Sequence, residues 1–170
     1  NRVTSVTGIM NGTTNYILTQ MEKNGASFSD ALSDAQARGY AERDPSADID
    51  GVDTCRKLCI LADLAFGYQV DPARVLCEGI RRITEQDISD ASDAGYRIKL
   101  LGHVRETASG IAPIVAPFFI KKTHILSGVS GVFNGIGVVG NMVGETMFFG
   151  HGAGSAPTAS AMVGDLIEAL

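Results

Sequence analysis

The chain has 170 residues, enough for one domain with its own hydrophobic core, and 45% of them are apolar, which excludes a disordered tail. Its net charge of −5, without a basic stripe, argues against a nucleic-acid partner. No apolar run reaches the roughly 18 residues that a membrane span needs, so we expect no membrane partner either.

Three cysteines, Cys55, Cys59 and Cys77, are an odd and sparse set, which indicates reduced thiols in a cytoplasmic protein. Cys55 and Cys59 could both face a metal from one helix, but zinc needs four ligands and no histidine or second cysteine pair completes the set. We therefore predict no metal site. The first residues, NRVTSVTGIM, have neither signal-peptide features nor an initiator Met, which favours a piece of a longer chain.

The first third of the sequence predicts a strand and three helices. RVTSVTGI is rich in β-formers, and a helix follows NGTTN, capped by Thr13 or a neighbour and stopped by Gly25. SFSDALSDAQARGY repeats this pattern, with a serine cap at its start and Gly39 at its end. An acidic loop comes next, and then a helix from about Val52 to Phe66 that ends at Gly67.

The remainder predicts more strands and two helices. ARVLCEGI is typical of a short strand, and TEQDISDASDAG of a polar helix capped by Thr84, with Asp87 as its capping-box partner. YRIKLLGHVRE and GIAPIVAPFFIKK predict two strands around TASG, residues 125–150 predict a helical turn and two strands, and SAPTASAMVGDLIEAL predicts the last helix. We expect one α+β domain over residues 1–170: a mixed β-sheet with helices packed on one face.

Two glycine-rich stretches are candidates for nucleotide contacts. GIGVVG, residues 135–140, matches the dinucleotide fingerprint, but the next residues, NMVGETMFFG, indicate a strand, whereas the fingerprint must open a helix; we interpret it as part of a strand pair. GHGAGSAPTAS, residues 150–160, runs directly into a helix N-terminus, where free N–H groups favour anions. The alternative for this loop is an ordinary turn with a Ser155 cap.

The stretch GYAERDPSADIDGVDTCRK, residues 39–57, concentrates charge just before and inside a helix. Asp53 and Lys57 are four residues apart and therefore neighbours on that helix. An exposed pair of this kind contributes little to stability. Ile60 and Leu64 fall on the same stripe, however, so we expect the pair to share its face with core residues, with Arg56 and Asp63 marking the solvent side.

A lysine and a carboxylate at the edge of a core need a partner or a task. A partly desolvated lysine can exchange protons near neutral pH. Glu42 and Asp48, in the same stretch, could hold a cationic group such as an α-ammonium. These residues favour a pocket for a small amino acid with a lysine as acid or base.

Three segments carry a resemblance to a known family. GYAERDPSADIDGVDTCRKLCILA resembles the substrate-site signature of homoserine dehydrogenases, GIMNGTTNYIL resembles their strand-to-helix entry, and GETMFFGHGAGSAPTASAMVGDLI resembles their closing segment. The similarity runs in order from residue 3 to residue 170. It implies NAD(P)-dependent interconversion of homoserine and aspartate 4-semialdehyde, a step toward threonine, methionine and isoleucine.

The resemblance also implies roles for the charged residues. Lys57 would give the proton to the carbonyl oxygen, or take it in the reverse direction, and Asp53 would orient Lys57 and touch the substrate hydroxyl. Glu42 would bind the substrate ammonium, and Asp48 would support this cluster.

Further residues would act through their backbone. Tyr40 and Gly8 would line the substrate pocket, and the loop from Gly152 to Gly154 would lie near the cofactor, with Gly154 as the best single candidate.

The family's nucleotide-binding domain has no counterpart in residues 1–170. By the resemblance, most of the site for the cofactor, NADP or NAD, would lie in that domain, and this part would bind substrate and form a homodimer. The alternatives are a non-catalytic amino-acid-binding module that uses the same acidic loop, and a plain dimerisation scaffold. A nucleotide-binding unit upstream of Asn1 would favour the enzyme.

Overall fold

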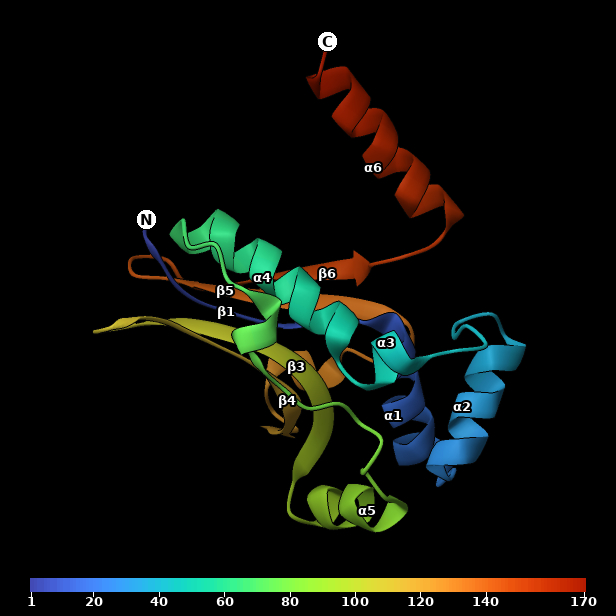
Figure 1. Cartoon of the computed structure of the whole chain (residues 1–170). Coiled ribbons are helices and arrows are strands. Elements are labelled where there is room, and N and C mark those ends of the chain that lie inside the picture. The colour runs from blue at the N-terminus through green and yellow to red at the C-terminus, as the bar shows by residue number, and fades with distance from the viewer.

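The structure is a computed structural model that describes residues 1–170, and it contains one mixed sheet and six helices (Figure 1). The strands are β1 (Val3–Ile9), β2 (Leu76–Cys77), β3 (Tyr96–Thr107), β4 (Gly110–Lys121), β5 (Phe133–Gly140) and β6 (Gly144–His151). The helices are α1 (Gly12–Asn24), α2 (Phe28–Ala37), α3 (Ser46–Ile49), α4 (Val52–Phe66), α5 (Glu85–Asp93) and α6 (Ser155–Glu168), with 3-10 turns η1 (Pro72–Arg74) and η2 (Ile125–Gly128).

The sheet has the strand order β2-β4-β3-β1-β5-β6. Two hairpins, β3–β4 and β5–β6, flank β1, which pairs antiparallel with both β3 and β5. Only the two-residue strand β2 runs parallel to its neighbour, β4. The expected mixed sheet of an α+β domain is therefore confirmed, and GIGVVG lies in the β5–β6 hairpin, as the strand interpretation required.

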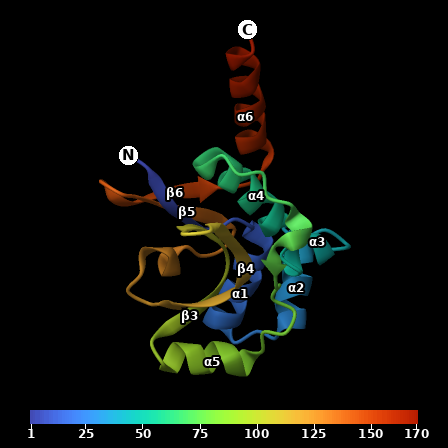
Figure 2. The ribbon, with the colours of Figure 1, turned by 60° about the vertical axis from the view of Figure 1, so that its left-hand side comes forward.

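Helices α1, α4 and α5 all contact β3, and they lie on one side of the sheet, whereas α6 projects away from the body (Figures 1 and 2). The main core lies between these helices and the sheet. A smaller cluster lies on the opposite face, beneath η2. Strand β3 serves both, since Leu100 belongs to the main core and Leu101 to the smaller cluster. No helix is long and apolar enough to cross a membrane.

Most predicted helix ends are confirmed. Helix α4 has the predicted bounds and ends at Gly67, whose φ of 69° lies in the left-handed region that glycine adopts without strain. Thr84 and Asp87 form the predicted capping box of α5. The cap of α1 is Asn11, two positions before Thr13, and its side chain accepts a hydrogen bond from the Thr14 amide.

One alternative, the Ser155 cap, and one expectation, the buried stripe of α4, were wrong. Ser155 is the first residue of α6 and not its cap, because the chain enters that helix through Gly154 and no side chain caps it. Ile60 and Leu64 are not in the core; they are 61% and 79% exposed. Helix α4 has apolar residues on two stripes, and the stripe that contains Leu58 and Ala62 is the one that packs on the sheet.

Candidate active site

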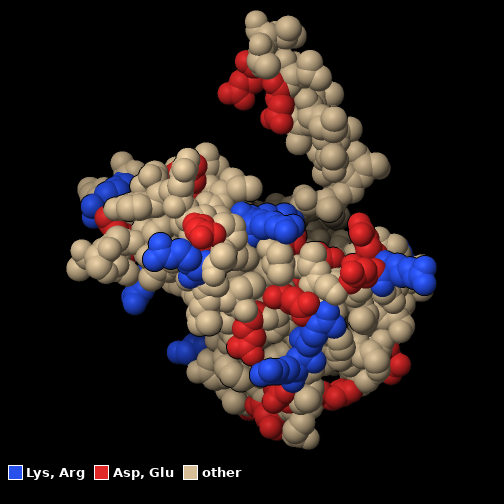
Figure 3. All heavy atoms as spheres, in the orientation of Figure 1, with Lys and Arg blue, Asp and Glu red and all other residues tan.

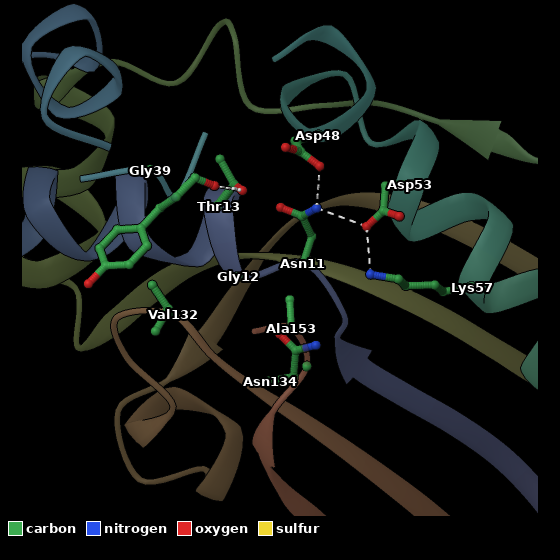
Figure 4. A pocket seen from close by; sticks show the side chains of 12 residues that line it. Asn11, Gly12, Thr13, Gly39, Asp48, Asp53, Lys57, Val132, Asn134 and Ala153 are labelled. Atoms are coloured by element: carbon green, nitrogen blue, oxygen red, sulfur yellow. Dashed lines mark hydrogen bonds and ion pairs between the residues drawn. The ribbon is translucent and has the colours of Figure 1, made fainter. Parts of the chain in front are cut away.

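A cavity of about 270 Å3 opens where the N-terminal ends of α1 and α4 meet the loop before α3 and the start of β5 (Figure 4). Its lining is mostly polar, and its charged side chains are two carboxylates and one ammonium. The lining residues are Asn11, Gly12, Thr13, Gly39, Tyr40, Asp48, Asp53, Lys57, Val132, Asn134, Gly152 and Ala153.

Lys57 and Asp53 form the ion pair that their spacing on α4 predicts. The Nζ of Lys57 donates to Asp53 Oδ2 at 2.8 Å and to the Met10 carbonyl oxygen at 3.2 Å. The side chains are 44% and 30% exposed, so the ammonium sits at the cavity mouth and not in the core. Because an ammonium has three N–H donors and these contacts use two, one donor is available to a ligand.

Asn11 joins the two carboxylates of the cavity. Its Nδ2 donates to Asp48 Oδ1 at 2.7 Å and to Asp53 Oδ2 at 2.9 Å, while its Oδ1 accepts from the Thr14 amide (Figure 4). One amide therefore caps α1 and holds two carboxylates from α3 and α4 side by side. Without these donors the two like charges would repel each other at close range.

The loop before α3 is fastened to α1 by Thr13 and Tyr40. The Thr13 hydroxyl donates to the Tyr40 carbonyl oxygen at 2.6 Å, and the Tyr40 ring packs on Tyr16 with centroids 4.9 Å apart. These contacts fix one rim of the cavity to the same helix that carries Asn11.

The opposite wall comes from the start of β5 and the segment before α6. The Nδ2 of Asn134 donates to the Met10 carbonyl at 3.4 Å, while its Oδ1 is buried without a partner. Gly152 lies directly against this amide, so that a β-carbon at position 152 would stand 1.8 Å from Asn134 Nδ2. Any side chain at this position would displace the wall.

The structure brings together most of the residues that the sequence singled out. Lys57, Asp53, Asp48, Tyr40 and Gly152 all line the cavity.

Three predicted site residues lie outside the lining. Glu42 is exposed in the loop before α3, where its backbone carbonyl accepts from Gln36. Gly8 is buried in β1 between β3 and β5, and Gly154 caps α6 with a φ of 130°.

Sequence reasoning missed Asn11, Gly12, Thr13, Val132 and Asn134 as site residues. The NGTTN segment indicates a helix entry, and the cap preference of asparagine was the available signal for Asn11. No local pattern marks Val132 or Asn134, which reach the cavity only because β5 pairs with β1.

Charges of both signs share the face of the molecule that Figure 3 shows, and no single-sign field dominates it. The cavity itself carries a net negative charge, because its lining contains two carboxylates, Asp48 and Asp53, and one ammonium, Lys57. The cavity can therefore attract a cationic group while its one ammonium addresses an oxygen of the same ligand.

Comparison with known proteins matches residues 1–167 to the family model described as homoserine dehydrogenase. This chain belongs to the homoserine dehydrogenase family. It is 51% identical to the homoserine dehydrogenase of Helicobacter pylori and 49% identical to that of Synechocystis sp., over 99% of the chain in each case and 40% of each relative. It thus spans about two fifths of the length of these relatives.

Solved structures agree with this assignment. The homoserine dehydrogenase of Thiobacillus denitrificans superposes on 98% of the chain with a TM-score of 0.96 and 46% identity, and the chain covers 39% of that protein. A hyperthermophilic archaeal homoserine dehydrogenase, solved in complex with NADPH, gives a TM-score of 0.82 at 28% identity over 98% of the chain and 47% of that protein.

The loop Gly152–Gly154 is the chain's candidate contact for one end of a nicotinamide cofactor. It borders the cavity at Gly152 and Ala153, where no side chain is larger than a methyl group. Gly154 has a backbone conformation that L side chains rarely adopt. The fingerprint-like GIGVVG lies in an antiparallel hairpin and cannot bind a dinucleotide in the way that the fingerprint does.

Proposed function

We propose that this chain is the substrate-binding part of an NAD(P)-dependent oxidoreductase that interconverts homoserine and aspartate 4-semialdehyde. Membership of the homoserine dehydrogenase family supports the reaction class. The observation that carries the proposal is the Lys57 ammonium, held by Asp53 at a cavity that also presents Asp48. In a cell, the reaction would serve threonine, methionine and isoleucine synthesis in the cytoplasm.

Lys57 is the proposed acid. When the aldehyde is reduced, negative charge develops on the carbonyl oxygen, and a positioned ammonium both stabilises that charge and donates the proton. Asp53 and the Met10 carbonyl hold two of the three Nζ donors, which aims the remaining one. In the oxidation direction the neutral amine would take the hydroxyl proton.

The amino-acid end of the substrate would bind at the carboxylates. Asp48 lines the cavity and is the nearest candidate for the substrate ammonium. Glu42, exposed on the neighbouring loop, is the second. Backbone groups of Tyr40 would complete this end, and Gly8 would act through the β1 backbone that leads to Met10.

The nicotinamide cofactor, when bound, supplies or accepts the hydride. Gly152, Ala153 and Gly154 would contact it from this chain, since their loop borders both the cavity and the N-terminus of α6. We propose that the remaining contacts, including those that select NADP or NAD, come from a separate nucleotide-binding domain.

The experiment that tests the function is an assay of the full-length protein with homoserine, once with NADP and once with NAD. Oxidation of homoserine with either cofactor is expected. Binding of homoserine without oxidation would overturn the enzyme proposal and favour the alternative, an amino-acid-binding module that uses the same carboxylates. The isolated 170 residues are expected to show no useful turnover beside the full-length chain.

We also propose a homodimer that forms through the β6 side of the sheet. Strand β6 is an edge strand, and it exposes Phe148 and Phe149 by 65% and 61%. The turn before it exposes Met142 and Val143 by 81% and 65%. An apolar edge of this kind invites a second copy of the chain.

A further inference from the structure

Lys99 is a buried lysine that the proposed reaction does not use. It lies in the middle of β3 with 1% of its surface exposed, on the strand face opposite the main core. No carboxylate forms an ion pair with it. Instead, its Nζ donates to Asn15 Oδ1 at 2.9 Å and to the Val129 carbonyl oxygen at 2.8 Å. A buried amine held only by neutral acceptors is costly, so a role is expected.

Asn15 extends this contact to the start of β5. Its Nδ2 donates to the Phe133 carbonyl at 3.0 Å and approaches the Val129 carbonyl at 3.4 Å. The two carbonyls fix the orientation of the amide, because they can only accept and therefore face its Nδ2. Asn15 is also 1% exposed, so water does not compete for these bonds.

The segment that these two residues hold forms one wall of the cavity. Residues 129–134 include Val132 and Asn134, both in the lining. Thr19, one turn beyond Asn15 on α1, accepts from the Gly131 amide at 3.1 Å and fastens the same segment.

The opposite wall belongs to the same helix. The first turn of α1 supplies Asn11, Gly12 and Thr13. The walls meet closely at Gly12, where a β-carbon would stand 2.8 Å from the Val132 carbonyl oxygen. The distance between the walls is thus determined by how residues 129–134 dock on α1.

We propose that Lys99 and Asn15 are positioning residues that set the width of the substrate cavity, by fixing residues 129–134 against the first turns of α1. The inference rests on the proposed function for the identity of the substrate. Neither residue lines the cavity, and both act through the residues that do.

Polar contacts suit this task better than apolar ones. The neighbouring side chains on this face, Leu101, Leu126 and Val129, form an apolar cluster whose contacts tolerate sliding. Hydrogen bonds to backbone carbonyls fix both distance and direction. Burial lowers the pKa of Lys99 to about 8. Because a neutral amine keeps two N–H donors, the two contacts persist in either protonation state.

Two variants of the full-length protein test the proposal. Lys99→Met removes both donors at nearly constant volume. Asn15→Asp keeps an acceptor for Lys99 and gives it a charged partner, but it replaces the donor to Phe133 and Val129 by an oxygen that their carbonyl oxygens repel. Lys122→Met is the matched control, because the Lys122 Nζ also makes two hydrogen bonds, to Ser92, on the exposed surface away from the cavity.

Both test variants should raise KM for homoserine by about tenfold, the factor that corresponds to one ordinary hydrogen bond or two. KM for the cofactor should change little in both test variants, and Lys122→Met should match the wild type in both KM values. A merely structural role would lower stability without this split between the two KM values. If Lys99→Met does not fold, the KM of Asn15→Asp for homoserine tests the proposal alone. An unchanged KM for homoserine in folded Asn15→Asp overturns the proposal.

Failure of the proposed function is distinguishable from failure of this inference. If the wild type does not oxidise homoserine, the function is wrong, and amide hydrogen exchange then tests the positioning alone. Faster exchange in residues 129–134 of Asn15→Asp than of Lys122→Met, with exchange in α5 of Asn15→Asp unchanged from the wild type, would support it. Equal exchange in the two variants would overturn it.

Discussion

Asn11 and Asp53 are joined across the cavity by a hydrogen bond of 2.9 Å from the amide Nδ2 to Oδ2, the same carboxylate oxygen that accepts from Lys57. Asp53 therefore receives two donors at one oxygen. The position of Lys57 depends on Asp53, and the position of Asp53 depends on the cap of a different helix. Lys57 on α4 and Asn11 at the N-terminus of α1 are therefore coupled through Asp53.

Lys57→Ala in the full-length protein should lower kcat for homoserine by roughly 10²–10⁴-fold, the range typical of a lost general acid or base. The fold should remain intact, because the side chain is 44% exposed. Arg56→Ala is the matched control: its side chain is exposed on the same turn, and it should leave kcat unchanged. Near-normal kcat in Lys57→Ala would mean that the proton comes from elsewhere.

Asn11→Ser should keep the cap of α1 and lose the link between Asp48 and Asp53, because serine accepts from the helix amides but cannot reach both carboxylates. Two charge-assisted hydrogen bonds are lost, each worth about 1.5–3 kcal/mol. We expect kcat/KM for homoserine to fall by at least about tenfold with the helical circular-dichroism signal unchanged. Thr84→Ser, the equivalent change at the cap of α5, is the control; a similar loss there would contradict a specific role for Asn11.

Asp48→Asn should mainly raise KM for homoserine, because Asp48 lines the cavity without contacting Lys57. Glu42→Leu should act in the same direction, and more weakly if the exposed position of Glu42 persists when substrate binds. Steady-state kinetics of the two variants separate these roles. A fall in kcat for Asp48→Asn at unchanged KM would remove Asp48 from ammonium binding.

The sequence was sufficient to predict the elements that local rules govern. The bounds of α4 follow from its apolar residues and the glycine at its end, and the Asp53–Lys57 pair follows from helical spacing. The direction in which α4 faces does not follow, because Leu58 and Ile60 belong to two different apolar stripes and periodicity cannot choose between them.

The rest of the cavity is created by tertiary contacts. Asn134 follows Asn11 by more than a hundred positions, and the two meet only because β5 docks beside β1. Lys99 illustrates the same limit: it lies in a strand of apolar neighbours, and its acceptors come from α1 and from the segment after η2. No local pattern contains these pairings.

The full-length protein should be a dimer at micromolar concentration by sedimentation. Phe149→Lys places a charge on the exposed edge strand β6 and should shift the protein toward monomer. Leu76→Lys is the matched control, because Leu76 is also exposed, at 68%, on β2 at the opposite edge of the sheet. If Leu76→Lys dissociates the dimer and Phe149→Lys does not, the interface lies on the other edge.

Lys99 should give the fold a pH dependence that Lys99→Met lacks. Burial lowers the pKa of Lys99 from 10.5 to about 8; Glu22 opposes this, while Arg97 and Lys23 reinforce it. Between these values the unfolded chain binds a proton that the folded protein does not, so stability rises with pH. The lowering of the Lys99 pKa from 10.5 to about 8 corresponds to a gain of about 3 kcal/mol in the free energy of unfolding across this pH range.

The measurement is urea unfolding at pH 7, 8, 9 and 10 for the wild type, Lys99→Met and the control Lys122→Met. Other groups whose pKa differs between the folded and the unfolded chain also contribute in this range. Cys59 is one, because burial raises its pKa from 9.0 to about 11, but such groups are common to all three proteins and cancel in the differences. The stability of the wild type relative to Lys99→Met should be constant below pH 8 and rise from pH 8 to 10. The stability of the wild type relative to Lys122→Met should not rise from pH 8 to 10, because both proteins contain Lys99. A constant difference between the wild type and Lys99→Met across the range would mean that Lys99 keeps its proton when buried, and that a charged ammonium, not a neutral amine, holds residues 129–134 in place.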